Sequence, residues 1–211
     1  MSERRRLMLG QKKLPYDAQI NYLQCTGTQY IDLGFKPTNN IQIDVVFNRA
    51  NNGIRFDCGA ENGWEYKIVR CVVIENDFLW WRNTYNSPAG SYTSVSSISL
   101  IGDVRIVCNG RTATAYNLTS DSTIGSINSP TTTSFTADEN FILFGIGYQG
   151  GASYSSAQNG LKLYSIKIVD NGVNLDLTPV RKGQVGYLYD KNSGRLFGNS
   201  GTGSFILGSD I

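Results

Sequence analysis

Histidine is absent from this chain of 211 residues. It is the side chain whose ordinary pKa lies closest to neutral pH, so its absence excludes Ser-His and Cys-His nucleophilic arrangements and the usual general base of hydrolases. No Cys-x-x-Cys pair occurs either, which leaves only four dispersed thiols for a zinc site. We therefore expect no bound metal and no cofactor.

The four cysteines are Cys25, Cys58, Cys71 and Cys108. An even number is compatible with two disulfides in a secreted protein. Three of the four, Cys25, Cys71 and Cys108, lie in apolar, strand-like runs. Cysteine behaves as a small apolar residue in such surroundings, and we interpret all four as buried free thiols.

Long apolar runs are also missing. No window approaches the roughly 20 residues that cross a membrane. The short run Leu7, Met8 and Leu9, which follows basic residues, is far too short for a signal peptide. We expect a soluble protein, made in a cytoplasm and not inserted into a membrane.

Positive charge is concentrated at the N-terminus. The formal charge of the chain is +2, but residues 1–13 contain five basic residues and one acidic residue, so the rest is slightly acidic. A nucleic-acid-binding protein carries basic residues over a whole face instead. The charge distribution predicts a basic arm over residues 1–16, a body over residues 17–211, and no nucleic acid as partner.

Helical periodicity is nearly absent, whereas strand-like segments separated by turn signals recur throughout the body. In residues 40–48, Ile41, Ile43, Val45 and Phe47 occupy alternate positions, which is typical of a strand with one buried face. The other expected strands cover residues 20–25, 28–33, 65–74, 78–82, 103–108, 112–116, 141–146, 162–169 and 173–177. So many strands in one domain predict a sandwich of two sheets.

Three hairpins are indicated. Asn109-Gly110 and Asn171-Gly172 each separate two strand-like runs, as in a type I′ turn whose two central residues need positive φ. A third hairpin, residues 185–197, closes the chain, and we expect its Tyr187, Tyr189 and Phe197 to be packing residues. Segments rich in Gly, Ser and Thr are expected to be long loops, namely residues 87–99, 119–134 and 149–158.

Five segments resemble one family. They are the start Glu3-Arg-Arg-Arg-Leu-Met8, residues 14–34 with Cys25-Thr-Gly-Thr-Gln-Tyr-Ile-Asp-Leu-Gly34, residues 40–47, residues 161–172, and the closing segment 176–208. Together they resemble the concanavalin A-like (LamG-like) jelly-roll proteins of tailed phages and prophages of gut Bacteroidales, crAss-like phages included. The resemblance implies an all-β jelly-roll sandwich of two antiparallel sheets with an extended basic N-terminal arm.

A structural role on the virion surface is what this resemblance implies. The protein is then a head (capsid) or tail fibre or decoration subunit, and a homo-oligomer such as a dimer or trimer. Its arm would dock on capsid or other virion proteins, and its sandwich would project outwards. The expected docking residues are Arg4, Arg5, Arg6, Leu7, Met8 and Leu9. The alternative for this segment is a solvated basic tail.

Paired carboxylates give little support for catalysis. Glycosidases of this fold superfamily carry several acids on one strand, whereas the comparable strand here offers only Asp44. Glu61 and Glu65 lie in or beside Gly-rich sequence, where a strand that places both on one face is doubtful. Other acids are scattered without an Asp-x-Asp-x-Asp calcium loop. We expect a protein without enzymatic activity.

Aromatic residues indicate an alternative function, a lectin-like module for host surface polysaccharide. Trp80 and Trp81 are adjacent on an expected strand, so one should point into the core and the other outside. An exposed indole can stack on a sugar ring. The candidate glycan-binding residues are Trp64, Trp80, Trp81, Asn83 and Tyr85. The competing interpretation is that these residues pack the sandwich or a subunit interface.

Overall fold

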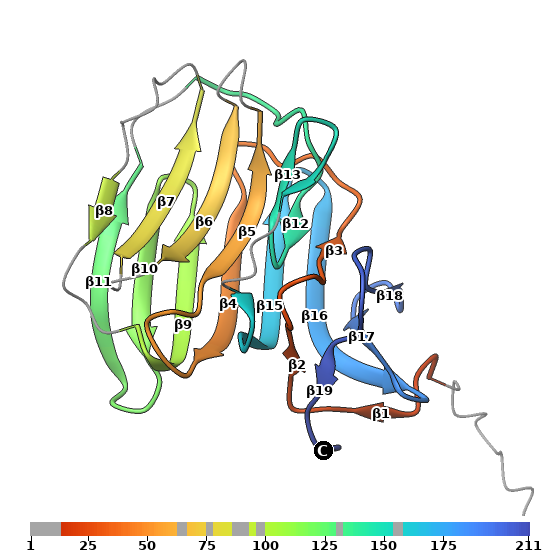
Figure 1. Cartoon of the computed structure of the whole chain (residues 1–211). Helices are drawn as coiled ribbons and strands as arrows, with labels where there is room; N and C mark the ends of the chain where they lie inside the picture. Colours follow the sequence, from red (N-terminus) through yellow and green to blue (C-terminus); the bar gives the residue numbers. More distant parts are fainter. Residues whose placement is uncertain are drawn as a thin grey trace, which may run out of the picture.

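The computed structural model of the protein describes residues 14–62, 67–74, 78–85, 93–95, 100–129, 133–153 and 158–211. Within these ranges the chain is all-β, with no α-helix, and its strands form two sheets, a larger and a smaller one (Figure 1). None of the described residues forms a helix long and apolar enough to span a membrane.

The larger sheet has the strand order β11-β10-β9-β4-β15-β16-β17-β18, and all its pairings are antiparallel. In that order the strands are β11 (Ser122–Asn128), β10 (Thr112–Asn117), β9 (Gly102–Asn109), β4 (Gln42–Arg49), β15 (Lys162–Asp170), β16 (Val173–Lys182), β17 (Val185–Asp190) and β18 (Leu196–Phe197). Three short strands extend it: β1 (Ala18–Gln19) pairs with β16, β2 (Leu23–Gln24) with β15, and β19 (Ile206–Leu207) with β2.

The smaller sheet has the order β14-β13-β5-β6-β7-β8. Its strands are β14 (Gly151–Ser153), β13 (Ile146–Tyr148), β5 (Phe56–Glu61), β6 (Ile68–Ile74), β7 (Phe78–Thr84) and β8 (Thr93–Val95). Two short strands join it, since β12 (Ile142–Leu143) pairs with β5 and β3 (Ile31–Asp32) pairs with β12. Within the described residues, the contact between β13 and β5 is the one parallel pairing.

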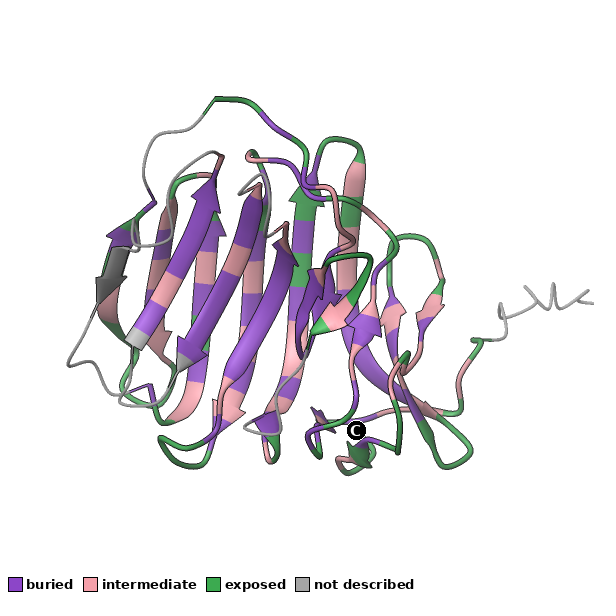
Figure 2. Ribbon diagram, turned by 45° about the horizontal axis from the view of Figure 1, so that its top comes forward, coloured by how far each residue is buried: buried purple, intermediate pink, exposed green. Residues whose placement is uncertain are grey.

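The core lies between the two sheets. Side chains on β4 alternate in burial as the sequence predicts, with Ile43, Val45 and Phe47 facing inwards. The ring of Phe47 stacks on Phe56 of β5 in the opposite sheet, with 4.3 Å between ring centroids. Buried segments alternate with partly exposed ones along the strands in Figure 2. Each fully buried apolar side chain contributes roughly 1.5–3 kcal/mol, so this interface is the main source of stability.

All four cysteines are free and buried, as interpreted from their apolar neighbours. Burial raises the pKa of the Cys58 thiol well above its ordinary value. Cys71 of β6 contacts Cys108 of β9 across the core, and that contact raises the pKa of Cys71. Burial likewise raises the pKa of the Cys25 thiol, so Cys25, Cys58 and Cys71 are protonated, unreactive packing groups at neutral pH.

The two Asn-Gly signals give different turns. At Asn171-Gly172 both residues have positive φ, +23° and +86°, as a type I′ turn requires. The prediction for Asn109-Gly110 is wrong in detail, because Asn109 stays in β9 opposite Thr112 and the two-residue turn is Gly110-Arg111. Of the two turn residues only Gly110 has positive φ, and its amide donates a hydrogen bond to the carbonyl of Ile41.

Three of the expected loops contain strands instead. These are β8, β11 and β14, and each is the last strand at an edge of its sheet. The expected single strand over residues 141–146 is interrupted, because Phe144 has a φ of +59° and separates β12 from β13. In the closing hairpin, Phe197 is in the core, whereas Tyr187 and Tyr189 are half-buried.

Candidate functional site

The two adjacent tryptophans of β7 point to opposite sides, as predicted. Trp81 is fully buried, and its indole Nε1 donates a hydrogen bond to the carbonyl oxygen of Gly110 at 3.0 Å. Trp80 is half-buried on the other side of the sheet, the side turned away from the core. Trp64 lies outside the described residues.

Two further candidates from the sequence are tied to the core. Asn83 is 1% exposed, and its Nδ2 donates to the carbonyl oxygens of Asn39 at 2.7 Å and Gly110 at 2.8 Å. Tyr85 packs beside Phe135, with 6.2 Å between ring centroids. The structure therefore does not gather these aromatic residues into one surface, and Trp80 is the candidate among the described residues that lies on the outer face of the smaller sheet.

The expected docking residues Arg4 to Leu9 lie outside the described residues, but the point where the chain enters the sandwich is defined. The backbone amide of Asp17 donates to the carbonyl of Arg181 at 2.9 Å, and the Asp17 carboxylate accepts from the amide of Gly183 at 2.7 Å. The ring of Tyr16 contacts Tyr189 edge-on, with 4.9 Å between centroids. The chain is thus fixed to the β16–β17 hairpin from Tyr16 onwards.

The C-terminal end meets the N-terminal entry at the same place (Figure 1). The amide of Ile211 donates to the carbonyl of Gln19 at 3.0 Å, and Arg181 forms a bidentate pair with Asp210 at 2.7 and 2.5 Å. We call this region the base; it comprises residues 14–21, 179–185 and 206–211. Four of the large apolar side chains that the structure leaves exposed lie in it: Leu14, Val185, Ile206 and Ile211.

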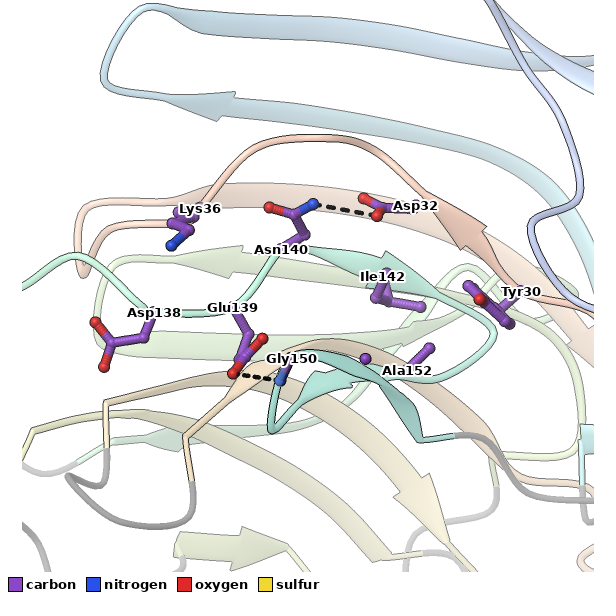
Figure 3. A pocket seen from close by; sticks show the side chains of 10 residues that line it. Tyr30, Asp32, Lys36, Asp138, Glu139, Asn140, Ile142, Gly150 and Ala152 are labelled. Atoms are coloured by element: carbon purple, nitrogen blue, oxygen red, sulfur yellow. Dashed lines mark hydrogen bonds between the residues drawn. The ribbon is translucent and has the colours of Figure 1, made fainter.

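A polar depression opens on the smaller-sheet side of the molecule. This outer pocket has a volume of about 460 Å³ and is formed by β3, β12, the β13–β14 turn and the segment that precedes β12. Figure 3 shows its lining side chains. They are Tyr30, Asp32, Lys36, Asp138, Glu139, Asn140, Ile142 and Ala152, with the backbone of Gly150 and Gly151.

The carboxylates of the outer pocket are each held in place by donors of the protein. Asp32 accepts from the amide of Gly34 at 2.7 Å and from Nδ2 of Asn140 at 3.1 Å. Glu139 accepts from the amide of Gly150 at 2.8 Å through one of its oxygens. Both carboxylates are half-buried and carry further lone pairs that can accept from a ligand.

Asp138 and Lys36 form one end of the outer pocket. Burial alone would raise the pKa of Asp138, but hydrogen bonds from Asn62 and Lys67, with the charges of Lys67 and Lys36, hold that pKa below its usual value. Asp138 is therefore ionised at neutral pH. Lys36 is exposed and makes no direct ion pair with the described residues, so its ammonium is available to a ligand.

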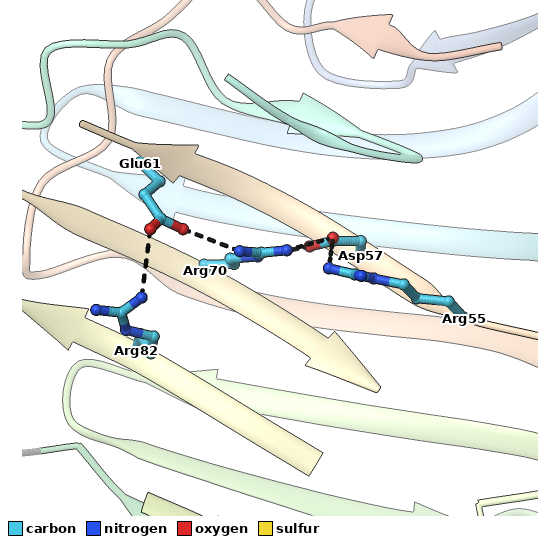
Figure 4. A network of polar contacts seen from close by, with 5 residues as sticks. All are labelled: Arg55, Asp57, Glu61, Arg70 and Arg82. Atoms are coloured by element: carbon cyan, nitrogen blue, oxygen red, sulfur yellow. Dashed lines mark hydrogen bonds and ion pairs between the residues drawn. The ribbon is translucent and has the colours of Figure 1, made fainter. Parts of the chain in front are cut away.

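A chain of alternating charges crosses the neighbouring strands of the same sheet (Figure 4). Arg70 donates to Asp57 through Nε at 3.0 Å and Nη2 at 2.7 Å, and to Glu61 through Nη1 at 2.9 Å. Arg55 adds a bond to Asp57 at 2.6 Å, and Arg82 adds one to Glu61 at 3.3 Å. Both carboxylates form ion pairs with guanidinium groups, and such pairing makes them poor candidates for a general acid or base.

Sequence reasoning missed the outer pocket. Its residues come from three separate segments that the sequence gives no reason to combine. A weak signal exists in the consecutive polar residues Asp138, Glu139 and Asn140 directly before a buried strand.

The described residues contain no group of three or more His, Cys, Asp or Glu side chains arranged to hold a metal ion. Compared with protein-family models and with curated proteins, the sequence matches none of either.

Proposed function

We propose that this protein is a non-enzymatic structural subunit of a phage virion, a head or tail fibre or decoration protein with a concanavalin A-like jelly-roll fold. The observation that carries the proposal is the geometry of the base. The chain is fixed from Tyr16 onwards at the place where its C-terminus also ends. The basic segment therefore precedes a point that is fixed to the β16–β17 hairpin, and the base that contains this point carries exposed apolar side chains.

The chemistry of the base suits contact with another protein. Exposed apolar side chains beside polar residues are typical of interaction surfaces. Arg4, Arg5 and Arg6 add a positive charge that an acidic surface of a capsid or tail protein would attract. The proposal includes a virion-surface location for the sandwich and a symmetric homo-oligomer, such as a dimer or trimer.

Charge removal in the arm tests this function. The triple variant Arg4→Ser, Arg5→Ser and Arg6→Ser should lose co-sedimentation with particles assembled from the neighbouring genes. A matched control removes the same charge from exposed positions of the sandwich, by Arg105→Ser, Lys167→Ser and Lys191→Ser. The control should co-sediment like the wild type. If both triple variants still co-sediment, the arm is not the docking element.

Carbohydrate binding is the second candidate function, and the outer pocket is the observation that favours it. A pocket of this volume falls in the range of small-molecule sites, roughly 300–1,000 Å³. Its lining combines carboxylates, an amide, an ammonium group and an aromatic ring. Binding of the wild-type protein to an array of bacterial surface polysaccharides tests this candidate, and no binding to any of them would reject it.

A further inference from the structure

The outer pocket presents two kinds of surface. Tyr30 lies at one end with Ala152 and Ile142 near it, and Lys36 and Asp138 lie at the other end (Figure 3). Between the ends, the Asp32–Asn140 pair lies on one side and Glu139 on the other. A sugar ring has C–H groups on one face and hydroxyls around its edge, so it fits both the apolar and the polar parts of the pocket. Aromatic and aliphatic side chains contact the C–H face, and carboxylates accept hydrogen bonds from the hydroxyls.

The charges of the pocket narrow the class of ligand. The lining has three carboxylates and one ammonium group, and the Lys67 ammonium pairs with Asp138, so one negative charge remains in excess and disfavours an anionic sugar such as a uronic acid. A cationic ligand would satisfy the carboxylates but leave the Lys36 ammonium facing a like charge. A hydroxyl suits both ends, since it donates to a carboxylate and accepts from an ammonium.

We propose that the outer pocket binds a neutral pyranose unit of a surface polysaccharide. Asp32, Glu139 and Asn140 bind its hydroxyls, Lys36 donates a hydrogen bond to it, and Tyr30 contacts the C–H face of the ring. This inference rests on the second function proposed above and places that function at a site separate from the aromatic residues of β7. Between β13, at the pocket, and β7, which carries Trp80, lie β5 and β6.

The pocket is built before any ligand arrives. Asp32 and Glu139 are oriented by the amides of Gly34 and Gly150, so little side-chain entropy remains to be lost on binding. Gly147 lets the segment before β12 lie close to β13, because a Cβ at that position would be 2.1 Å from the carbonyl oxygen of Asn140. Both observations indicate that the backbone holds the polar groups in one arrangement.

Saturation-transfer NMR with the full chain tests the proposal. The probes are methyl pyranosides of glucose, galactose, mannose and glucuronic acid, with spermidine as a cationic probe. We expect at least one neutral pyranoside to bind, with a dissociation constant on the order of millimolar for a single sugar. Glu139→Gln and Asp32→Asn keep the shape of the side chain and remove its charge, and each should weaken binding about tenfold or more.

Two further variants separate the pocket from the fold and from other surfaces. Lys36→Ala alters an exposed side chain, so it should weaken binding without changing the thermal unfolding midpoint. Trp80→Ala should leave pyranoside binding unchanged. The proposal is overturned if glucuronate or spermidine binds in preference to every neutral pyranoside, or if the pocket variants bind as the wild type does.

The same series distinguishes the two levels of inference. If the wild type binds a polysaccharide and only Trp80→Ala abolishes binding, carbohydrate binding stands and the outer pocket is not its site. If the wild type binds no saccharide in any form, both the pyranose site in the outer pocket and the carbohydrate-binding function are rejected. The proposed particle incorporation is tested with variants of the arm, so neither outcome alters the test of the virion role.

Discussion

Arg70 is the centre of the charge network on the smaller sheet, and its removal should be among the most destabilising polar substitutions. Its guanidinium makes three hydrogen bonds to Asp57 and Glu61. Asp57 is 3% exposed, so water cannot replace the lost partner. Burial lowers the pKa of Arg70, but the two carboxylates outweigh burial and raise it, which keeps the group charged.

The expected cost follows from what remains after Arg70→Met. Breaking a buried ion pair by removing one partner costs about 3–5 kcal/mol. Asp57 keeps Arg55, and Glu61 keeps Arg82, so the loss should lie near the lower end, about 3 kcal/mol. With a urea dependence of about 3 kcal/mol/M for a chain of this size, the unfolding midpoint should fall by about 1 M.

Urea unfolding followed by tryptophan fluorescence measures this shift. Lys167→Met is the matched control, because it breaks an ion pair to Asp176 in which the lysine is 61% exposed. An exposed pair contributes less than about 1 kcal/mol, so the control should move the midpoint only slightly. Equal shifts for the two variants would refute the argument that burial makes the network important. The losses from Arg70→Met and Asp57→Asn should be less than additive in the double variant, since both substitutions remove the same Arg70–Asp57 hydrogen bonds.

Three other predictions follow from the described residues. Gly59→Ala should lower the free energy of unfolding by about 3 kcal/mol or more, because its Cβ would be 2.1 Å from the carbonyl oxygen of Val69. Gly110→Ala has open space around the new Cβ and should lower it by about 1 kcal/mol. Thermal unfolding of the two variants measures the difference. All four thiols should resist an aromatic disulfide reagent at neutral pH and react only in denaturant, because they are buried. Burial opposes ionisation of Asp190, but hydrogen bonds from Ser193 and from the amides of Asp176 and Asn192 outweigh it and lower the pKa of Asp190. This carboxylate therefore stabilises the protein above its unfolded pKa and stops doing so as the pH falls through its folded pKa. Asp190→Asn should flatten the acid dependence of the urea midpoint, and an unchanged dependence would contradict this assignment.

The long central strands could be predicted because one of their faces is buried. In β4 the buried positions recur at every second residue, which is the period that sequence shows. The edge strands β8, β11 and β14 could not, because an edge strand has a neighbour on one side only and needs no continuous apolar face. Ser, Thr and Gly make up most of the residues of these strands, and the same residues in a sequence predict a loop.

Turn residues predict a hairpin more reliably than its register. Asn171-Gly172 forms the turn expected of it, whereas Asn109 is retained in β9 by its pairing with both Gln42 and Thr112. The carbonyl oxygen of Gly110 then accepts from Trp81 and Asn83 of the other sheet. These contacts across the core select the turn, and no local pattern contains them.

The outer pocket was invisible to sequence reasoning for a related reason. Tyr30 and Asp32 precede Asn140 by more than a hundred residues, and they are brought together by the pairing of β3 with β12 and by backbone hydrogen bonds beside it. The sequence indicated the tryptophans as glycan-binding residues instead, because a sequence shows aromatic residues without showing whether they are exposed. Trp81 is an example of a buried one, since its indole N–H donates a hydrogen bond inside the core.

The base and the outer pocket use different parts of the sandwich, and this separation determines how the two proposed functions relate. The base is formed by β1, β16, β17 and β19 of the larger sheet, whereas the pocket is formed by β3, β12, β14 and the segments beside them in the smaller one. Among the described residues, the contacts given above for Tyr16, Asp17 and Ile211 are made with the base and with Tyr189, outside the pocket lining. A subunit that docks through its base therefore leaves its pocket lining unused, so attachment and ligand binding do not compete for the same side chains. The Arg70 network connects the central strands of the smaller sheet. We therefore expect it to stabilise the sheet beside the pocket without contacting a ligand or a docking partner.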